Sequence, residues 1–446
     1  MIGWAVAMIS KSSSRQIVAV LGSLMLVPTV FPQGPLAPTG PPVPTMKSLN
    51  QIDTRVGTAG ERIPVNATTC PGDTNAVYVI AQRGSYFLTG NVIGVAGKNG
   101  IHISSPEVTL DLNGYQLDGA AVGVIGILID QDSVTVRNGR VLNWSSRAID
   151  AEGPGARSFE RVVAANSDAG FFIFGQARYE SCCAINNRHS GFDGFLGHQY
   201  HACFTSGNGD FGFVLFDGNT AESCLSLRDS IGYIFVGSAI VARGCTASQF
   251  QSFGFYVQTQ GASLVDCVAT TSASGGSAYV ILDPAAGVPS AAVFNQCTAA
   301  YFPGPGGNTG FDASGATGVT FSACVATGWG TAGFSVGLGS TVSDCSASNN
   351  SGCGIVFSDG GAIIGNTSFG NRDGISGVGA QNRLDGNTVT GNSGTGILVT
   401  DATNVVVRNL SRNPGSNYSP LSGTNIGPTG QTPGGASPAT SPWANF

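Results

Sequence analysis

Residues able to do acid–base chemistry are few and lie close together. Three of the four histidines, His189, His198 and His201, share one short stretch, with Asp193 among them and Asp217 shortly after it. Histidine changes charge near neutral pH, so a histidine beside carboxylates can give or take a proton. The sequence therefore predicts a candidate catalytic cluster of Asp193, His198, Asp217 and His201. The alternative is an ordinary solvated surface on which charges cluster by chance.

The composition excludes several classes of protein. The 446 residues include 66 glycines and 42 % hydrophobic residues, but only 10 % charged residues, against roughly 25 % in a typical soluble domain. Disorder requires low hydrophobicity with high net charge, so a disordered chain is excluded. A net charge of −6 with scattered Lys and Arg disfavours nucleic acid as a partner.

A repeat organises the elements that must position any site. A glycine followed by an alternating apolar pair recurs every 20 to 23 residues in two series: Gly170, Gly191, Gly212, Gly232, Gly254, and Gly310, Gly333, Gly354, Gly374, Gly396. A second column follows 12 to 14 residues later: Cys182, Cys203, Cys224, Cys245, Cys267, Cys297, Cys324, Cys345, Asn366, Asn387, Asn409, with Asn113 and Asn138 assigned to it near the start. The alternation of apolar residues after the glycine indicates a strand. The break in this two-residue period before the second column indicates a bend in the chain.

Each repeat must stack on its neighbours, because one alone cannot bury its apolar face. The prediction is an all-β, three-sided parallel coil of about fourteen rungs of roughly 21 residues. A rung opening near Ser277 carries two loop insertions, around Asp283–Ser290 and Phe302–Gly307. A leucine-rich repeat is the competitor, but leucine does not recur here and no segment has helical periodicity.

The residue choices resemble a known class. Three segments are similar to rungs of right-handed parallel β-helix proteins of the pectin-lyase-like class. They are Gly100–Ile103, Val108–Gly114 and, later in the chain, Leu384–Asn392. The resemblance covers about residues 76–412 and implies the fold, not an activity, since members include lyases, hydrolases, epimerases and phage spikes. The Asp-Asp, Arg-x-Lys and Asp-Pro-His signatures of its enzymes are absent. Calcium is implied only by this resemblance; no cofactor is expected and a metal site is left unknown.

Stacked rungs turn sequence columns into vertical ladders. An outward ladder is expected to contain Glu180, His201, Glu222 and Arg243. The two glutamates would lie on the order of 10 Å apart with His201 between them. This ladder is a second candidate acid–base site.

Outward positions of the first strand are unexpectedly apolar. They form a stripe larger than a monomer normally leaves bare: Phe172, Phe174, Phe195, Val214, Phe216, Ile234, Val236 and Tyr256. Three explanations stay open: cover by residues 35–75 or by the C-terminal tail, pairing in a homo-oligomer, or stacking on sugar rings. For the last, the candidate ligand-binding residues are Phe172, Phe174, Phe195, Phe216 and Tyr256.

The eight column cysteines are expected to be free, buried thiols that pack like small apolar residues. No CxxC pair accompanies them, which disfavours zinc. Cys70, Cys183 and Cys353 lie off the column and are the candidates for any disulfide.

The ends suggest export. Lys11 and Arg15 precede an apolar run, Ile17–Val27, which is too short to span a membrane and typical of a signal peptide. The expected organisation is a signal peptide over residues 1–33, a Pro-rich segment over 34–75, the β-helix over 76–412 and a Gly/Pro/Ser/Thr-rich tail over 413–446. Trp443 and Phe446 in this tail are candidates for docking against the body.

The preferred interpretation is a secreted, periplasmic or surface protein that binds carbohydrate or is structural, without a recognisable catalytic motif. The alternative is a polysaccharide lyase or glycoside hydrolase with a site near Asp193, His198 and Asp217. A further alternative is an oligomeric adhesin or fibre component held together by the apolar stripe.

Overall fold

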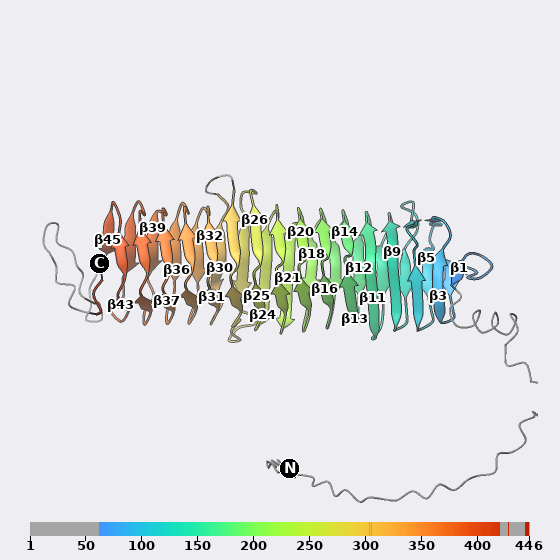
Figure 1. Ribbon diagram of the computed structural model, residues 1–446, viewed down its shortest axis with the longest axis horizontal. Helices are drawn as coiled ribbons and strands as arrows, with labels where there is room; N and C mark the ends of the chain where they lie inside the picture. The colour runs from blue at the N-terminus through green and yellow to red at the C-terminus, as the bar shows by residue number, and fades with distance from the viewer. Residues whose placement is uncertain (1–61, 303, 305, 420–426, 428–441, 446) are drawn as a thin grey trace, which may run out of the picture. The chain divides into compact units, whose positions relative to one another are not determined.

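The computed structural model describes residues 62–302, 304, 306–419, 427 and 442–445. The predicted signal peptide and the stretch Pro35–Pro44 lie outside these residues. Gly60–Phe446 forms one compact unit, in which short strands lie side by side along a rod (Figure 1). Every pairing between its named strands is parallel, as in β16–β19 and β17–β20.

One face of the rod is a 16-stranded sheet with one strand from each rung, called the first sheet here. Its strands are β2 (Ala76–Ile80), β5 (Asn99–Ile103), β8 (Ile127–Ile129), β10 (Arg147–Ala151), β12 (Ala169–Ile173), β15 (Ser190–Gly194), β18 (Phe211–Leu215), β21 (Ile231–Ser238), β24 (Phe253–Gln260), β27 (Ser277–Leu282), β30 (Thr309–Gly315), β33 (Ala332–Val336), β36 (Cys353–Phe357), β39 (Asp373–Gly377), β42 (Thr395–Val399) and β45 (Ser416–Ser419).

The other two faces share a bent 29-stranded sheet. The second face contains β1 (Ile63–Val65), β3 (Gly84–Leu88), β6 (Val108–Asp111), β9 (Val134–Leu142), β11 (Ala156–Ala165), β13 (Gln176–Glu180), β16 (Gln199–His201), β19 (Thr220–Glu222), β22 (Val241–Arg243), β25 (Ser263–Val265), β28 (Val293–Asn295), β31 (Thr320–Ser322), β34 (Thr341–Ser343), β37 (Ala362–Ile364), β40 (Arg383–Asp385) and β43 (Val405–Val407). The third face contains β4 (Val92–Ile93), β7 (Gln116–Asp118), β14 (Cys183–Ile185), β17 (Phe204–Ser206), β20 (Leu225–Leu227), β23 (Thr246–Ser248), β26 (Val268–Thr271), β29 (Thr298–Tyr301), β32 (Val325–Thr327), β35 (Ser346–Ser348), β38 (Thr367–Phe369), β41 (Thr388–Thr390) and β44 (Leu410–Arg412). The long strands β9 and β11 continue from the second face onto the third.

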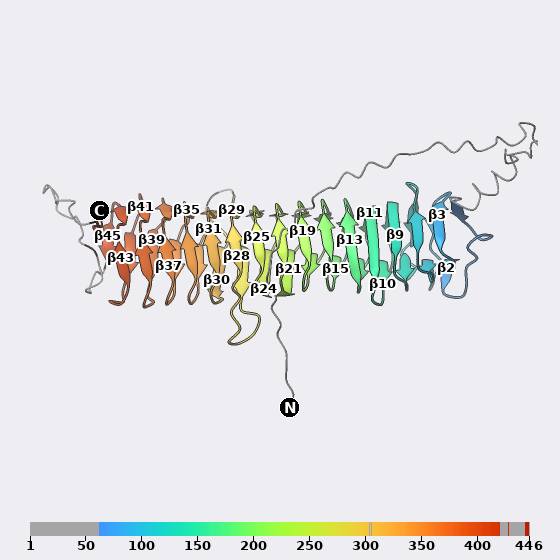
Figure 2. The same ribbon diagram turned by 60° about the horizontal axis from the view of Figure 1, so that its bottom comes forward.

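The predicted three-sided solenoid is confirmed, with sixteen rungs in the first sheet instead of about fourteen. The rungs that begin with β2, β10 and β45 lack the glycine and therefore escape the repeat pattern. The insertions expected after Ser277 are present as loops between β27 and β28 and between β29 and β30, and the first of them protrudes beyond the neighbouring turns in Figure 2.

The core is built from columns of like side chains. Eight aromatic rings of the first sheet stack continuously, with centroids 4.5 to 5.1 Å apart. They are Phe171, Phe192, Phe213, Tyr233, Phe255, Tyr279, Phe311 and Phe334. Beside this stack the backbones approach closely: a Cβ on Gly191 would lie 2.7 Å from the carbonyl oxygen of Gly212 in the next rung, so that column is restricted to glycine and small residues.

The second and third faces meet at a bend of one residue in the left-handed conformation, such as Ser181 (φ 53°). The inward cysteine follows it, which confirms the predicted break in period. Asn138 (φ 59°) lies in the bend itself, and Gly139 takes the inward place, since it is aligned with Val162 and thus with Cys182. The assignment of Asn138, and of Asn113 (φ 54°), to the inward column was therefore wrong by one position.

All eleven cysteines, including Cys70, Cys183 and Cys353, are free thiols. The column thiols are buried and donate to nearby carbonyl oxygens, as Cys224 Sγ does to Glu222 O at 3.3 Å. Burial raises the pKa of the Cys182 thiol well above its ordinary value. The column cysteines are therefore packed side chains whose hydrogen-bonding capacity is satisfied within the core.

Candidate functional site

The register of the first sheet assembles the apolar stripe. Phe172, Asp193, Val214, Ile234 and Tyr256 lie one above another on successive strands. Their side chains point outward because the alternate residues face the core, as a strand requires.

A second outward column carries three rings, of which Phe174 is exposed while Phe195 and Phe216 are half-buried. Phe174 and Phe195 stack with centroids 4.1 Å apart, and Phe195 and Phe216 follow at 5.5 Å. Phe172 packs edge-on against Phe174 at 5.3 Å. The Phe174 side chain is 42 % exposed. Phe174 and Phe195, together with Leu196 and the turn at Gly153–Gly155, line an open groove of about 540 Å³.

The stripe ends at a group of ionisable residues on the neighbouring rungs. The Arg147 guanidinium carbon lies 3.6 Å from the centre of the Phe172 ring, and its Nη1 donates to Asp150 Oδ2 at 2.5 Å. Asp150 is fully buried, and its other carboxylate oxygen, Oδ1, has no hydrogen-bond partner. Burial raises the pKa of Asp150, nearby Glu152 and Asp130 add to this, and Arg147 opposes it. A buried carboxylate with an unpartnered oxygen and a raised pKa is a group that can hold a proton.

A histidine–carboxylate pair lies on the next rungs. His102 Nε2 is 2.5 Å from Asp130 Oδ2. His102 shares a column with Leu128 and Asp150. Asp130 directly follows β8, which places it on the same outward face. Asp193, on the other side of Phe172, is half-buried, and burial raises its pKa while Arg147 lowers it.

The predicted cluster of Asp193, His198 and Asp217 is not assembled. The His198 imidazole lies inside the solenoid, where its Nε2–H donates to Gly175 O at 2.6 Å and its Nδ1 accepts from the Tyr179 and Tyr200 hydroxyls, each at 3.3 Å. Asp193 points to the opposite side of the sheet. Gly194 makes the space for the imidazole, since a Cβ there would lie 2.4 Å from His198 Nδ1.

Asp217 is engaged elsewhere. Its carboxylate accepts hydrogen bonds from the Ser238 backbone N–H at 2.5 Å and from the Ser238 hydroxyl at 2.8 Å. It therefore fixes the corner of the next rung and does not reach His198.

The burial of His198 gives a prediction for pH. Desolvation lowers its pKa from 6.5 to about 4, so the native state keeps it neutral while the unfolded chain protonates it below pH 6.5. The unfolded state binds more protons in this window, and His198 should therefore lower the free energy of unfolding by up to about 3 kcal/mol as the pH falls from 6.5 to 4.

Denaturant unfolding at several pH values would measure this slope, with His198→Gln as the comparison. Asp150, Asp193 and Asp229 have raised pKa values and oppose the trend, but they are common to both proteins. Equal slopes for the two proteins would contradict the assignment.

The second predicted ladder is assembled. Glu180, His201, Glu222 and Arg243 are aligned on successive strands of the second face. His201 Nδ1 lies 2.8 Å from Glu180 Oε1, and this hydrogen bond lowers the pKa of Glu180. Three members of the ladder, His201, Glu222 and Arg243, line an open groove of about 600 Å³ together with Arg178, Gln199 and Thr220. Its side chains are solvated, with His201 49 % exposed.

His102, Asp130, Arg147 and Asp150 were not among the site residues predicted from the sequence. A signal was present: each lies in or beside the alternating segment that follows a rung start at Gly100, Gly126 or Ala148. The spacing of these first rungs is less regular than that of the later ones, so their columns were not aligned from sequence.

Two further observations bear on the site. Among the described residues, no three or more His, Cys, Asp and Glu side chains are grouped so as to hold a metal ion. The same part of the chain contains no helix with the length and apolarity needed to cross a membrane.

The comparisons with known proteins define the class. Residues 286–416 match the family described as right handed beta helix region. The parallel solenoid continues from this region to both ends of the described body, which therefore has the architecture of a right-handed parallel β-helix. No curated protein matches the sequence.

Solved structures with a similar fold are distant in sequence. The catalytic domain of a GH87 alpha-1,3-glucanase in complex with tetrasaccharides is 12 % identical over 89 % of this chain and 70 % of its own, with a TM-score of 0.32. The A-module of mannuronan C-5 epimerase AlgE6 from Azotobacter vinelandii is 14 % identical over 84 % of this chain and 91 % of its own, with a TM-score of 0.25. Tailspike protein 3 of bacteriophage CBA120 is 11 % identical over 77 % and 58 %, with a TM-score of 0.36. No conclusion about activity or ligand follows from these values.

Proposed function

We propose that the protein binds carbohydrate along the outer surface of its first sheet, outside the cytoplasm. The observation that carries this proposal is the column Phe174, Phe195 and Phe216, whose nearly parallel rings lie beside an open groove. An exposed apolar surface of this kind marks an interaction site. Sugar rings have apolar faces that stack on aromatic rings, and Glu152, Gln176 and Asp193 border the stripe with groups that can bind hydroxyls. The basic, apolar N-terminal sequence supports export.

Removing one ring tests the proposal. Phe195→Ala, which deletes the central ring of the column, is expected to weaken binding to the best ligand of a glycan array about tenfold, since an aromatic contact contributes roughly 0.5–1.5 kcal/mol beyond its buried area. Phe369→Ala, at a 51 % exposed ring of the third face, should leave binding unchanged.

Two outcomes would count against sugar binding. Equal loss in both variants would show that the effect is not specific to the stripe. Failure to bind any glycan, together with a wild-type oligomer that Phe195→Ala dissociates, would identify the stripe as the subunit contact of an adhesin or fibre.

A second candidate function is hydrolysis of a glycosidic bond, favoured by the unpartnered oxygen of Asp150. Asp150 and Asp130 lie on adjacent rungs, offset by two residues, which places their Cα atoms about 8 Å apart. An inverting mechanism uses one carboxyl group as the acid and a second as the base that activates water. Asp130, held by His102, would take a proton from water as the water attacks the anomeric carbon. Asp150 would give its proton to the departing glycosidic oxygen. For this, the Arg147 side chain would move off the Phe172 ring, and the substrate would take its place.

Product release distinguishes this function from binding alone. Asp150→Asn and Asp130→Asn should abolish the release of reducing ends from the bound glycan while retention of that glycan persists. Asp210→Asn, at an exposed carboxylate paired with His189, serves as the control. Retention without products in the wild-type protein would reject hydrolysis and leave the binding proposal in place.

A further inference from the structure

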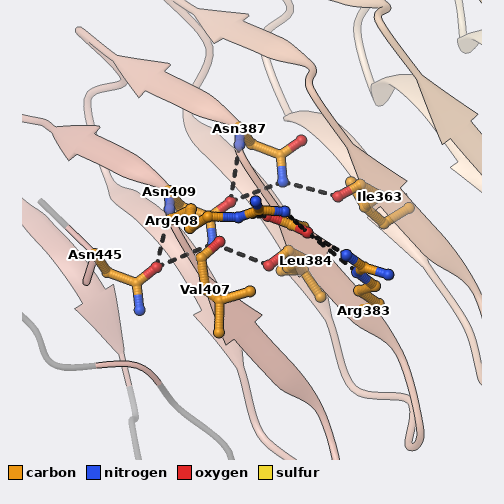
Figure 3. Close-up of polar contacts among 9 residues, drawn as sticks. Ile363, Arg383, Leu384, Asn387, Val407, Arg408, Asn409 and Asn445 are labelled. Carbon is orange, nitrogen blue, oxygen red and sulfur yellow. Dashed lines mark hydrogen bonds and ion pairs between the residues drawn. The ribbon is translucent and has the colours of Figure 1, made fainter. Parts of the chain in front are cut away.

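A ladder of buried amides runs along the inner side of the last rungs. Asn387 N–H and Nδ2 donate to Asn409 Oδ1 at 2.9 and 2.8 Å, and Asn387 Oδ1 accepts from Asn366 in the same way. The inward column ends with Asn409, yet the backbone and side-chain N–H groups of Asn409 have hydrogen-bond partners. Asn445 Oδ1 accepts from Asn409 N–H at 3.0 Å and from Asn409 Nδ2 at 3.1 Å (Figure 3).

Asn445 thus takes the place that the next rung would fill. Its Nδ2 donates to Val406 O at 2.9 Å and to Gly427 O at 3.1 Å, and Gly427 N–H donates to Val406 O at 2.9 Å. Asn445 is completely buried. These contacts cover the backbone edge of β43, the last strand of the second face.

A second contact lies on the outer side of the same strand. Asp385, which is buried, accepts from Arg383 Nη2 at 2.6 Å and from Arg408 Nε at 2.6 Å. The Arg408 guanidinium lies 5.6 Å from the centre of the Trp443 ring. The segment is therefore held on β43 by an amide inside and a stacked cation outside.

Other parts of the two ends of the solenoid core are covered by residues close in the chain. At the N-terminal end, the loop after β1 buries Cys70 in the core. A second ladder of Asn side chains lies at the corner between the third face and the first sheet. It ends within the last rung, where Asn413 N–H donates to Asn417 Oδ1 at 2.7 Å. Of the closures described, the one on β43 is made by residues distant in the chain, since Asn445 follows Asn409 by 36 residues.

We propose that Gly427 and Trp443–Asn445 form a detachable cap, which prevents β43 from pairing with β43 of a second copy. An uncovered strand edge presents unpaired N–H and C=O groups and is a template for another chain. Two uncapped β43 edges, one from each copy, would pair about a two-fold axis and give a symmetric dimer.

The test uses full-length variants. Asn445→Leu removes the amide and Trp443→Ala removes the ring on Arg408, whereas Pro442→Ala changes an exposed neighbour in the same segment. In both cap variants, the Asn409 amide hydrogen should exchange at least tenfold faster, and sedimentation should show a concentration-dependent doubling of mass relative to the wild-type protein. Pro442→Ala should do neither.

Protection of the Phe213 amide verifies that each variant is folded. Unchanged exchange at Asn409 in both folded cap variants would show that the segment does not close the edge. Fast exchange without a change in mass would show that the edge does not pair. Either result overturns the proposal.

Discussion

Phe213→Ala is expected to lower the free energy of unfolding by about 3–5 kcal/mol, the cost of emptying a buried aromatic site that cannot collapse. The Phe213 ring lies 5.1 Å from Phe192 and 4.8 Å from Tyr233, nearly parallel to both. The backbone hydrogen bonds of the adjacent rungs fix the spacing of these neighbours, so they cannot move in to fill the space. Denaturant unfolding followed by circular dichroism would measure the change.

An exposed phenylalanine gives the matched control. Phe302 is 60 % exposed, and Phe302→Ala should change the free energy of unfolding by less than about 0.5 kcal/mol. A cost for Phe213→Ala as small as that of the control would mean that the ring stack is not a source of stability.

Asn387→Leu should be comparably damaging despite the similar size of the two side chains. It removes the acceptor of the Asn366 backbone and side-chain N–H groups and the donor to Ile363 O at 2.8 Å (Figure 3). Each unsatisfied buried group costs about 1–3 kcal/mol, so the expected loss is about 3–5 kcal/mol. The same denaturant unfolding measures it.

Asn387→Cys separates polarity from volume. In the neighbouring rungs Cys345 Sγ accepts from Cys324 N–H at 3.3 Å, so a sulfur at position 387 can partly replace the lost acceptor. The cysteine variant should lose about half as much stability as the leucine variant. Equal losses would show that the amide contacts are not responsible.

The repeat made the solenoid predictable because equal spacing places like residues in one column. Phe192 and Phe213 follow this rule, and so does the ladder of Glu180 and His201. His198 does not, because it follows a turn after β15, and the alternation that decides in from out within a strand does not continue through a turn. Its position depends on the space left by Gly194 and on the hydroxyls of its tyrosine neighbours, which no spacing reveals.

The group around Asp150 was missed for a related reason. Arg147 reaches Phe172 on the next rung and also donates a hydrogen bond to the buried Asp150. Column alignment predicts which residues are neighbours, but not which long side chain folds over which ring. The placement of Asn445 is likewise beyond a repeat analysis, because it belongs to no repeat.

The rung between β27 and β30 shows where this fold can carry additional chain. Asp283, at the start of the loop, accepts from Ser290 N–H near the end of the loop and from Thr317 N–H of the next rung, at 2.8 Å each. The insertion leaves the aromatic stack of the core intact, since the Tyr279 and Phe311 rings still stack with centroids 4.5 Å apart. The one-residue bend between the second and third faces offers no such freedom. A foreign peptide grafted between residues 284 and 289 would therefore be displayed on a rigid support, at a site chosen without disturbing the rungs on either side.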